Sequence, residues 1–384
     1  MEFVGIDLGA SSTRYVSHKG KIGVLPNNMV FLDQNTRVDL EPYSSEIEGA
    51  LDVTIETDKE SKYFPVRVLV GDLAMRYSPT NQRPSGISNK HTQQINYVSA
   101  ILAAAVCKHK NGMGDNFDIY LALPPVEVNS AKDYVKEQLC GTYKVTFNKL
   151  GITYEFTVQN VACYEESFLA LLAYFFDMNG KPKPAAQKYG YGNVLGLDIG
   201  ASTTDLAVAS NMRYIEKSGQ TFKTGGNIAR DFLADDLRAM YGFDVPVEIA
   251  EMAIAEGRIQ LGNTYEDISK YVESAKKKFA EQVVEQIQGY FRKINIPIQS
   301  IRAIVVSGGG SMRSEYVDEN MNIVITSQPM SHYITEELHK VCPGIEVEPY
   351  SENPRYANIS GLFIRASIDV ARRKAAMTNA SNAG

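Results

Sequence analysis

Several features that mark particular classes of protein are missing from this sequence of 384 residues. It has only 4 cysteines, and none of them stand in a CxxC motif, which is typical of reduced thiols in a cytosolic protein. The longest apolar run, 168–176, is far shorter than the roughly 20 residues that a membrane-spanning helix needs. The first residues, MEFVGID, lack the basic and apolar regions of a signal peptide. We therefore expect a cytoplasmic protein that does not contact the membrane.

Charge and short motifs exclude further classes. The net charge is −6, whereas a protein that binds nucleic acid directly usually has a basic face. The sequence has no GxxxxGK[ST] motif, no GxGxxG after a strand and no HExxH spacing. A P-loop NTPase, a Rossmann dinucleotide site and a zinc site are therefore disfavoured. The GxSxG turn of a serine hydrolase is also missing.

The length and the order of the expected elements predict two α/β domains. A chain this long exceeds one typical core, and apolar strands alternate with helices in both halves. A stretch rich in Gly, Pro and Lys, 177–193, is expected to link the halves, and the tail 375–384 is expected to be disordered. The expected divisions are domain I at 1–185 plus 355–384, with an inserted subdomain at about 27–90, and domain II at 186–354, with a mostly helical subdomain at about 235–295.

One short sequence occurs twice, half a chain apart. Val4–Thr13 and Leu195–Thr204 share six identical residues out of ten. Each copy reads as an apolar strand, then Asp, any residue, Gly, and small hydroxylated residues. Solenoid proteins repeat at much shorter periods, so this repeat indicates two domains of related architecture.

Each part of the repeat suits phosphate binding. Gly9 and Gly200 are expected to allow a positive φ angle and a close approach to a ligand. Backbone N–H groups in such turns converge on a concavity that suits anions. Asp7 and Asp198 would repel phosphate unless a cation such as hydrated Mg²⁺ accompanies it. Two ordinary hairpins with glycine turns are the alternative, but six matches in ten favour a phosphate clamp. Hydroxyl donors would come from Ser11, Thr13, Ser202 and Thr203.

With these turns, the chain resembles the actin/Hsp70/sugar-kinase superfamily, in which two related domains close over ATP. The five signals of that superfamily can all be placed in the sequence. The resemblance implies an actin-like fold, in which two related α/β domains, each with a small inserted subdomain, flank a nucleotide cleft. Gly361 would let two helices pack closely. The signals are GIDLGASSTR (phosphate-1), YEESFLALLAY (connect-1), GLDIGASTTD (phosphate-2), VVSGGGSM (adenosine) and ANISGLFIRA (connect-2).

The resemblance also implies ligands and residue roles. ATP or ADP and Mg²⁺ would be bound, with Asp7 and Asp198 holding the metal through water as part of the catalytic group. Glu166, at the start of connect-1, would orient or deprotonate the attacking water, and Glu165 is the alternative. The residues implied to bind the nucleotide are Gly9, Ala10, Ser11, Ser12, Thr13, Arg14, Gly200, Ala201, Ser202, Thr203, Gly225, Gly226, Asn227, Glu256, Gly308, Gly309, Gly310 and Met312.

Within the superfamily, the chain looks most like the ParM-type plasmid-segregation actins. We expect no Hsp70-type substrate domain after connect-2 and no amphipathic membrane helix at either end. The resemblance implies a head-to-tail filament that hydrolyses ATP after polymerisation. It would drive plasmid DNA segregation through a DNA-binding adaptor protein, without itself binding nucleic acid or membrane. A monomeric sugar-kinase-like phosphotransferase, a cell-shape actin homologue not linked to plasmids, and a scaffold without turnover remain alternatives.

Overall fold

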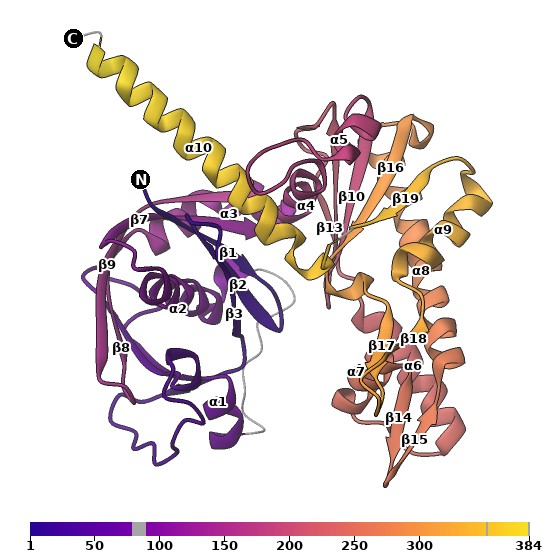
Figure 1. Cartoon of the computed structure of the whole chain (residues 1–384), viewed down its shortest axis with the longest axis horizontal. Coiled ribbons are helices and arrows are strands. Elements are labelled where there is room, and N and C mark those ends of the chain that lie inside the picture. Colours follow the sequence, from indigo (N-terminus) through magenta and orange to yellow (C-terminus); the bar gives the residue numbers. More distant parts are fainter. Residues whose placement is uncertain (79–89, 351, 383–384) are drawn as a thin grey trace. The chain divides into compact units, whose positions relative to one another are not determined.

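The structure is a computed structural model that describes residues 1–78, 90–350 and 352–382 (Figure 1). The chain forms two compact units. Unit 1 is Met1–Lys181 with Asn358–Gly384, and unit 2 is Pro182–Ala357. Each unit combines a β-sheet with helices, so the expected α/β class is confirmed.

Unit 1 is built on a sheet whose strand order, in the part of the chain described, is β3-β2-β1-β7-β9-β8-β5-β6-β4. β1 runs parallel to β7, and β7 runs parallel to β9, so these three strands end at one edge of the sheet. The carboxyl edge of parallel strands is where open α/β sheets usually bind ligands. The strands are β1 (Phe3–Leu8), β2 (Ser12–Ser17), β3 (Ile22–Pro26), β4 (Met29–Leu32), β5 (Asp52–Thr57), β6 (Val66–Val70), β7 (Asn116–Leu123), β8 (Gly141–Phe147) and β9 (Ile152–Glu165).

The helices of unit 1 form where apolar residues dominate or follow the helical period. The longest helix before the C-terminal one, α2, is buried over most of its length and packs on β1 and β2. It ends at Gly112, which adopts the left-handed conformation that often closes a helix. The helical segments are η1 (Ile47–Gly49), α1 (Asp72–Tyr77), η2 (Lys90–Thr92), α2 (Gln94–Asn111), α3 (Pro125–Leu139), α4 (Glu166–Phe175) and α10 (Ala357–Asn382).

Close packing of α4 against α10 depends on Gly361, as the sequence predicts. A Cβ atom on Gly361 would lie 1.8 Å from the carbonyl oxygen of Leu169 in α4. The two helix backbones therefore touch at this point, and only glycine fits there. Beyond this contact, α10 extends away from the rest of unit 1 (Figure 1).

Unit 2 is built on a smaller sheet of related topology. Its strand order is β12-β11-β10-β16-β19, with β13 on the free side of β11, and β10, β16 and β19 are parallel. The strands are β10 (Asn193–Ile199), β11 (Thr204–Ser210), β12 (Arg213–Tyr214), β13 (Gln220–Phe222), β16 (Ile301–Ser307) and β19 (Glu346–Pro349), with separate hairpins β14 (Arg258–Leu261)–β15 (Thr264–Asp267) and β17 (Ser314–Val317)–β18 (Ile323–Ser327).

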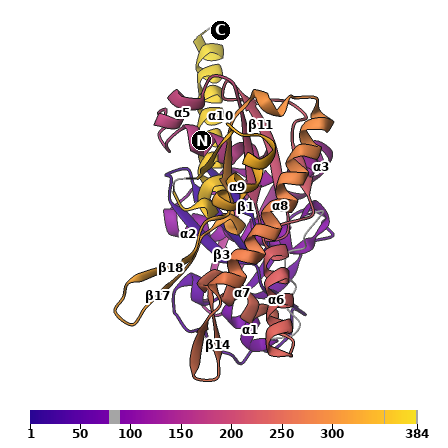
Figure 2. The same ribbon diagram turned by 90° about the vertical axis from the view of Figure 1, so that its right-hand side faces the viewer.

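Helices cover this sheet and extend beyond it. Long α8 packs against α6 and α9, and its buried face joins the same core as β10 and β16. The β14–β15 and β17–β18 hairpins project from the rest of unit 2 (Figure 2). The helical segments are α5 (Pro184–Tyr189), α6 (Asn227–Tyr241), α7 (Val247–Glu256), α8 (Ser269–Ile294), η3 (Ile298–Ser300), η4 (Gly309–Ser311), α9 (Met330–Val341) and η5 (Pro354–Tyr356).

The structure adds detail to several local expectations. Within the described part of the segment 27–90, β4, β5 and β6 belong to the main sheet of unit 1. The mostly helical segment 235–295 also contains the β14–β15 hairpin, and the stretch 177–193 contains α5. The tail expected to be disordered continues α10 as far as Asn382. Among the helices that the structure describes, none combines the length and apolar character needed to cross a bilayer.

Candidate functional site

The sequence repeat corresponds to a structural repeat. β1 and β2 form an antiparallel hairpin beside parallel β7, and β10 and β11 form the same arrangement beside parallel β16. Asp7 stands opposite Arg14 in the first hairpin, and Asp198 stands opposite Asp205 in the second. The two matching aspartates of the repeat, Asp7 and Asp198, are therefore each next to last in a buried strand that leads into the turn.

In unit 1, the turn after β1 carries a buried carboxylate and a guanidinium group. Asp7 is buried, and its Oδ2 lies 3.5 Å from Nη1 of Arg14. The predicted residues Gly9 to Arg14 form this turn and the start of β2, so the structure brings them together with Asp7.

A residue that the sequence analysis missed fixes this turn. Asn27 is buried, and its Nδ2 donates to the carbonyl oxygen of Gly9. Its Oδ1 accepts hydrogen bonds from the hydroxyls of Thr13, at 2.6 Å, and Ser99, at 3.3 Å. Its backbone N–H donates to the carbonyl oxygen of Ser11. The Thr13 hydroxyl therefore supports the turn from within.

The positive φ angle expected at the two repeat glycines is wrong. Neither Gly9 nor Gly200 has a positive φ angle. A Cβ atom on Gly9 would instead lie 2.7 Å from the carbonyl oxygen of Ser12, and one on Gly200 would lie 3.3 Å from that of Thr203. At both glycines the turn folds back on its own backbone, and the contact at Gly9 is too close for a side chain.

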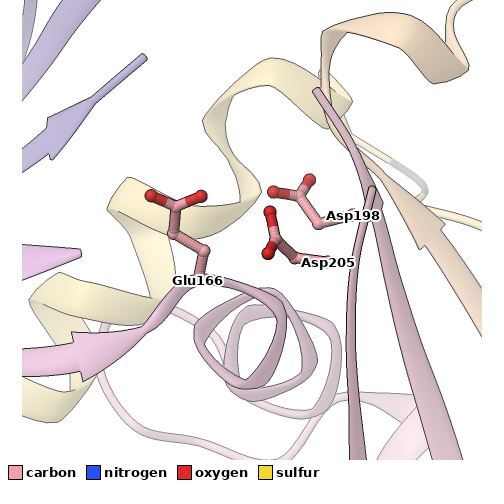
Figure 3. A group of neighbouring side chains, drawn as sticks. All are labelled: Glu166, Asp198 and Asp205. Atoms are coloured by element: carbon pink, nitrogen blue, oxygen red, sulfur yellow. The ribbon is translucent and has the colours of Figure 1, made fainter. Parts of the chain in front are cut away.

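The two candidate catalytic glutamates lie at the carboxyl edge of the unit 1 sheet. Glu165 is the last residue of β9, and Glu166 is the first residue of α4. Ala122 of β7 pairs with Asp7 on one side and with Tyr164 on the other, so Asp7 and Glu165 share this edge. Glu166 is buried, and its side chain projects from the start of α4 (Figure 3).

In unit 2, the turn after β10 carries two acids on neighbouring strands (Figure 3). One carboxylate oxygen of Asp198 lies within 4.8 Å of one of Asp205. Ser307 donates to Oδ1 of Asp198 at 3.1 Å, and the Thr221 hydroxyl donates to Oδ1 of Asp205 at 2.5 Å. The sequence analysis missed Asp205, although its place in the repeat, opposite Asp198, could have identified it.

The loop before α6 packs directly on this turn. The N–H of Gly226 donates to the carbonyl oxygen of Gly200 at 2.9 Å. The N–H of Asn227 donates to the carbonyl oxygen of Ala201 at 2.7 Å. Nδ2 of Asn227 reaches the hydroxyl of Ser202 at 3.4 Å. A Cβ atom on Gly225 would lie 2.6 Å from the backbone nitrogen of Thr203. The amino end of α6 is thus fixed beside the turn.

The glycine-rich segment after β16 packs against the same turn and the same loop before α6. A Cβ atom on Gly308 would lie 2.3 Å from the carbonyl oxygen of Ile199, and one on Gly310 would lie 3.0 Å from that of Gly200. A Cβ atom on Gly226 would lie 3.0 Å from Cα of Gly310. Three segments far apart in the sequence therefore meet backbone to backbone. We call them the glycine cluster: Gly200–Thr203, Gly225–Asn227 and Gly308–Gly310.

Met312 leads from this cluster to a surface pocket. A pocket of about 370 Å³ is lined by residues that include Met312, Arg313, Pro329 and Tyr350. Nζ of buried Lys276 donates to the carbonyl oxygen of Met312 at 3.1 Å. Burial lowers the pKa of this ammonium to about 7, against a usual value of 10.5.

Glu256 has its described contacts elsewhere in unit 2. It ends α7, where its Oε2 accepts from Nε of Arg258 at 2.8 Å and its carbonyl oxygen accepts from Thr326. Arg258 stacks on Tyr265 and Tyr316. The structure thus gathers the predicted unit 2 residues around the glycine cluster but gives Glu256 a partner at the two hairpins.

These groups suit a polyphosphate and a hard cation. Backbone N–H groups in a tight turn beside a helix amino end favour anions. Carboxylate oxygens of the kind supplied by Asp7 and Asp198 are the ligands that Mg²⁺ prefers. The donor set in each unit therefore fits a nucleotide with Mg²⁺.

Comparison with known proteins agrees with this fold. Residues 5–168 match the sequence model described as the N-terminal domain of actin-like proteins. Residues 196–318 match the one described as archaeal actin homologue MreB-like, C-terminal. None of the curated protein sequences is similar enough to the chain to count as a match.

Solved structures share the fold along nearly the whole chain. The actin-like protein Alp7A superposes with a TM-score of 0.71 at 18% identity, covering 98% of this chain and 99% of that one. A subunit of a 15-stranded ParM filament from Clostridium botulinum gives 0.65 at 17% identity, covering 96% and 99%. Bacillus thuringiensis ParM with ATP gives 0.64 at 16% identity, covering 96% and 98%.

The fold is that of the actin homologues, with two related α/β units and the paired turns described above. The two parts of the chain match models of actin-like proteins, and its likeness in fold is to ParM and Alp7A.

Proposed function

We propose that this protein binds ATP with Mg²⁺, assembles into filaments and hydrolyses the ATP after assembly. The observation that carries this proposal is the glycine cluster of unit 2, where three glycine-containing segments meet backbone to backbone at a tight turn beside two buried carboxylates. A sheet edge of this kind is suited to phosphate groups.

In this proposal, the turns Gly9–Arg14 and Gly200–Thr203 bind phosphate oxygens. Gly225–Asn227 hold the second turn against the amino end of α6, and Gly308–Gly310 with Met312 bind the nucleoside. Mg²⁺, held through water by Asp7 and Asp198, would neutralise phosphate charge. Glu166 accepts a hydrogen bond from the attacking water and takes its proton.

Assembly follows from head-to-tail contact between copies. Such contacts do not close on themselves, so they extend into a filament. The Clostridium botulinum ParM relative is described as a filament and the Bacillus thuringiensis ParM as a complex with ATP, which supports both parts of the proposal. For nucleotide to control assembly, ATP must favour the assembling conformation more than ADP does.

We further propose that the filament moves plasmid DNA in the cytoplasm. The net charge of −6 argues for a separate, basic adaptor protein between filament and DNA. The 4 free cysteines agree with a reducing compartment. The match to an MreB-like model favours a second candidate, a cytoskeletal filament that has no DNA cargo.

Sedimentation and negative-stain microscopy with Mg-ATP and with Mg-ADP test the proposal. We expect pelletable filaments with ATP that decay as phosphate is released. A protein that turns over ATP but stays soluble at high concentration, and whose turnover rises with a small hydroxylated substrate, would indicate a kinase. ATP binding without phosphate release would indicate a scaffold.

Two variants assign the roles within the site. Glu166→Ala should assemble with ATP and release phosphate slowly, and hydrolysis at the wild-type rate would remove Glu166 from the mechanism. Asp198→Ala should lose Mg²⁺-dependent nucleotide binding, and full binding would remove Asp198 from the site. Asp236→Ala is the matched control, because this unit 2 acid pairs with Lys278 on the surface.

A further inference from the structure

Glu166 has a lysine partner inside unit 1. Nζ of Lys90 donates to Oε1 of Glu166 at 2.8 Å, and the two side chains are only 11% and 7% exposed. Hydrogen bonds between charged groups are stronger and more directional than those between neutral groups. At this degree of burial, such a bond fixes the orientation of the Glu166 carboxylate.

Lys90 is itself held in place through its backbone. Its N–H donates to Oε1 of Glu127 in α3 at 2.9 Å. Its carbonyl oxygen accepts from Nδ2 of Asn96 in α2 at 2.9 Å. The η2 turn that carries Lys90 is thus anchored to two helices.

The neighbouring residue strengthens this anchor. Oε2 of Glu127 accepts from the N–H of His91 at 2.9 Å and lies 3.0 Å from its Nδ1. The hydroxyl of Tyr97 in α2 donates to the carbonyl oxygen of His91 at 2.6 Å. Both carboxylate oxygens of Glu127 therefore accept hydrogen bonds from η2, while the Lys90 ammonium donates to Glu166. Functional side chains are commonly oriented by neighbours that are themselves held by hydrogen bonds, as Lys90 is here.

We propose that Lys90 is the positioning residue for Glu166. It orients the carboxylate toward the water that attacks ATP and does not touch the nucleotide itself. This inference rests on the proposed ATPase function and deepens it. A catalytic base commonly depends on a further group for its orientation, as in the arrangement of nucleophile, base and orienting residue.

The assisted step is the hydrolysis of the γ-phosphate. The water oxygen forms a bond to the γ-phosphorus, and the bond from that phosphorus to the β–γ bridging oxygen breaks. The water proton passes to the Glu166 carboxylate and from there to the released phosphate. The products are ADP and inorganic phosphate, and Lys90 stays protonated throughout.

Steady-state phosphate release by the full chain with Mg-ATP tests the role of Lys90. Lys90→Met should lower kcat about 10- to 100-fold, because misplacing a reacting group by about 1 Å can cost that much. The KM for ATP should change by less than about 3-fold, because Lys90 does not bind the nucleotide. Lys90→Arg keeps the positive charge and should recover most of the rate.

Two further variants separate positioning from a purely structural role. In a Glu166→Gln background, Lys90→Met should reduce phosphate release by less than about 2-fold, because the two residues act as one unit. The double variant also removes both buried charges together, so it should fold where Lys90→Met alone is unstable. Circular dichroism at the assay temperature verifies folding.

Lys108→Met is the matched control. Lys108 is another buried lysine of unit 1, and its Nζ donates to Asp115 at 2.7 Å and to the carbonyl oxygen of Met113 at 2.9 Å. Its loss removes one buried positive charge without touching Glu166, and the carboxylate of Asp115 that it leaves is exposed. We expect an unchanged kcat for the folded protein.

The outcomes distinguish the two levels of the proposal. If Glu166→Gln is slow but Lys90→Met has the wild-type kcat, the positioning role of Lys90 is overturned and the role of Glu166 stands. A full loss on adding Lys90→Met to Glu166→Gln would also overturn it. If Glu166→Gln itself hydrolyses ATP at the wild-type rate, both the role of Glu166 and the inference built on it are wrong.

Discussion

Replacing Gly308 with alanine tests whether backbone contact builds the site of unit 2. Gly308 has φ 89° and ψ 162°, a conformation that costs other residues about 1–3 kcal/mol. An added Cβ would lie 2.3 Å from the carbonyl oxygen of Ile199 and 2.5 Å from Oδ1 of Asp198. One of these contacts is with backbone, so either η4 or the end of β10 must move.

We expect a large effect for a single methyl group. Strain and displacement together should lower the free energy of unfolding by about 3–5 kcal/mol, which is at the upper end for one substitution. For a domain of this size, that loss lowers the melting temperature by roughly 6–20 °C. Because the Asp198 carboxylate must shift, the affinity for Mg-ATP should fall at least about 10-fold, which is about 1.4 kcal/mol of binding free energy.

Thermal unfolding and titration with a fluorescent ATP analogue measure the two effects. Gly242→Ala is the control, because Gly242 has φ 74° and a Cβ there would meet nothing within 4 Å. It should show only the cost of the left-handed conformation, about 1–2 kcal/mol, and unchanged binding. If Gly308→Ala had the same melting temperature as Gly242→Ala and bound ATP like the wild type, the claim that backbone contact at Gly308 builds the site would be refuted.

Three further substitutions address the supports of the two units. Asn27→Ala should lower the free energy of unfolding by about 1–3 kcal/mol and weaken ATP binding, because it leaves the carbonyl oxygen of Gly9 without its hydrogen bond from Asn27. Equal urea midpoints for the variant and the wild type would contradict this. Gly361→Ala should destabilise unit 1 in thermal unfolding, since its Cβ would lie 1.8 Å from backbone; a wild-type melt would contradict close packing of α4 on α10. Burial lowers the pKa of Lys276 from 10.5 to about 7, so between these pH values the unfolded chain binds more protons than the folded one. The free energy of unfolding should therefore rise with pH in this range, by up to about 1.4 kcal/mol per pH unit. Urea titrations of Lys276→Met should lack that rise.

The sequence was sufficient to predict the α/β class and the two turns because both depend on local patterns. β1 and β10 are buried along almost all their length and read as continuous apolar runs, and each leads into a glycine turn at a fixed spacing. The close packing at Gly361 followed from the resemblance of ANISGLFIRA to the connect-2 signal, and α4 and α10 do touch there.

The supports of the site could not be predicted in the same way. Asn27 is 18 residues from Gly9, and Lys90 is 76 residues from Glu166, so neither pair forms a motif. Each contact exists only after the sheet and its helices have assembled. The tail from 375 was expected to be disordered as a chain terminus, but its alanines have high helix propensity and α10 continues to Asn382.

The two copies of the turn are alike in shape but differ in charge. At the same place in the hairpin, Asp7 faces Arg14, whereas Asp198 faces Asp205. The first carboxylate therefore has a guanidinium group 3.5 Å away, while Asp198 accepts a hydrogen bond from the hydroxyl of Ser307 and Asp205 accepts one from that of Thr221. Two carboxylates within 4.8 Å repel each other strongly in a buried site, and a divalent cation nearby relieves that repulsion. We therefore expect the proposed need for Mg²⁺ to arise mainly from the two neighbouring carboxylates of unit 2, because the carboxylate of the first turn already faces a guanidinium group.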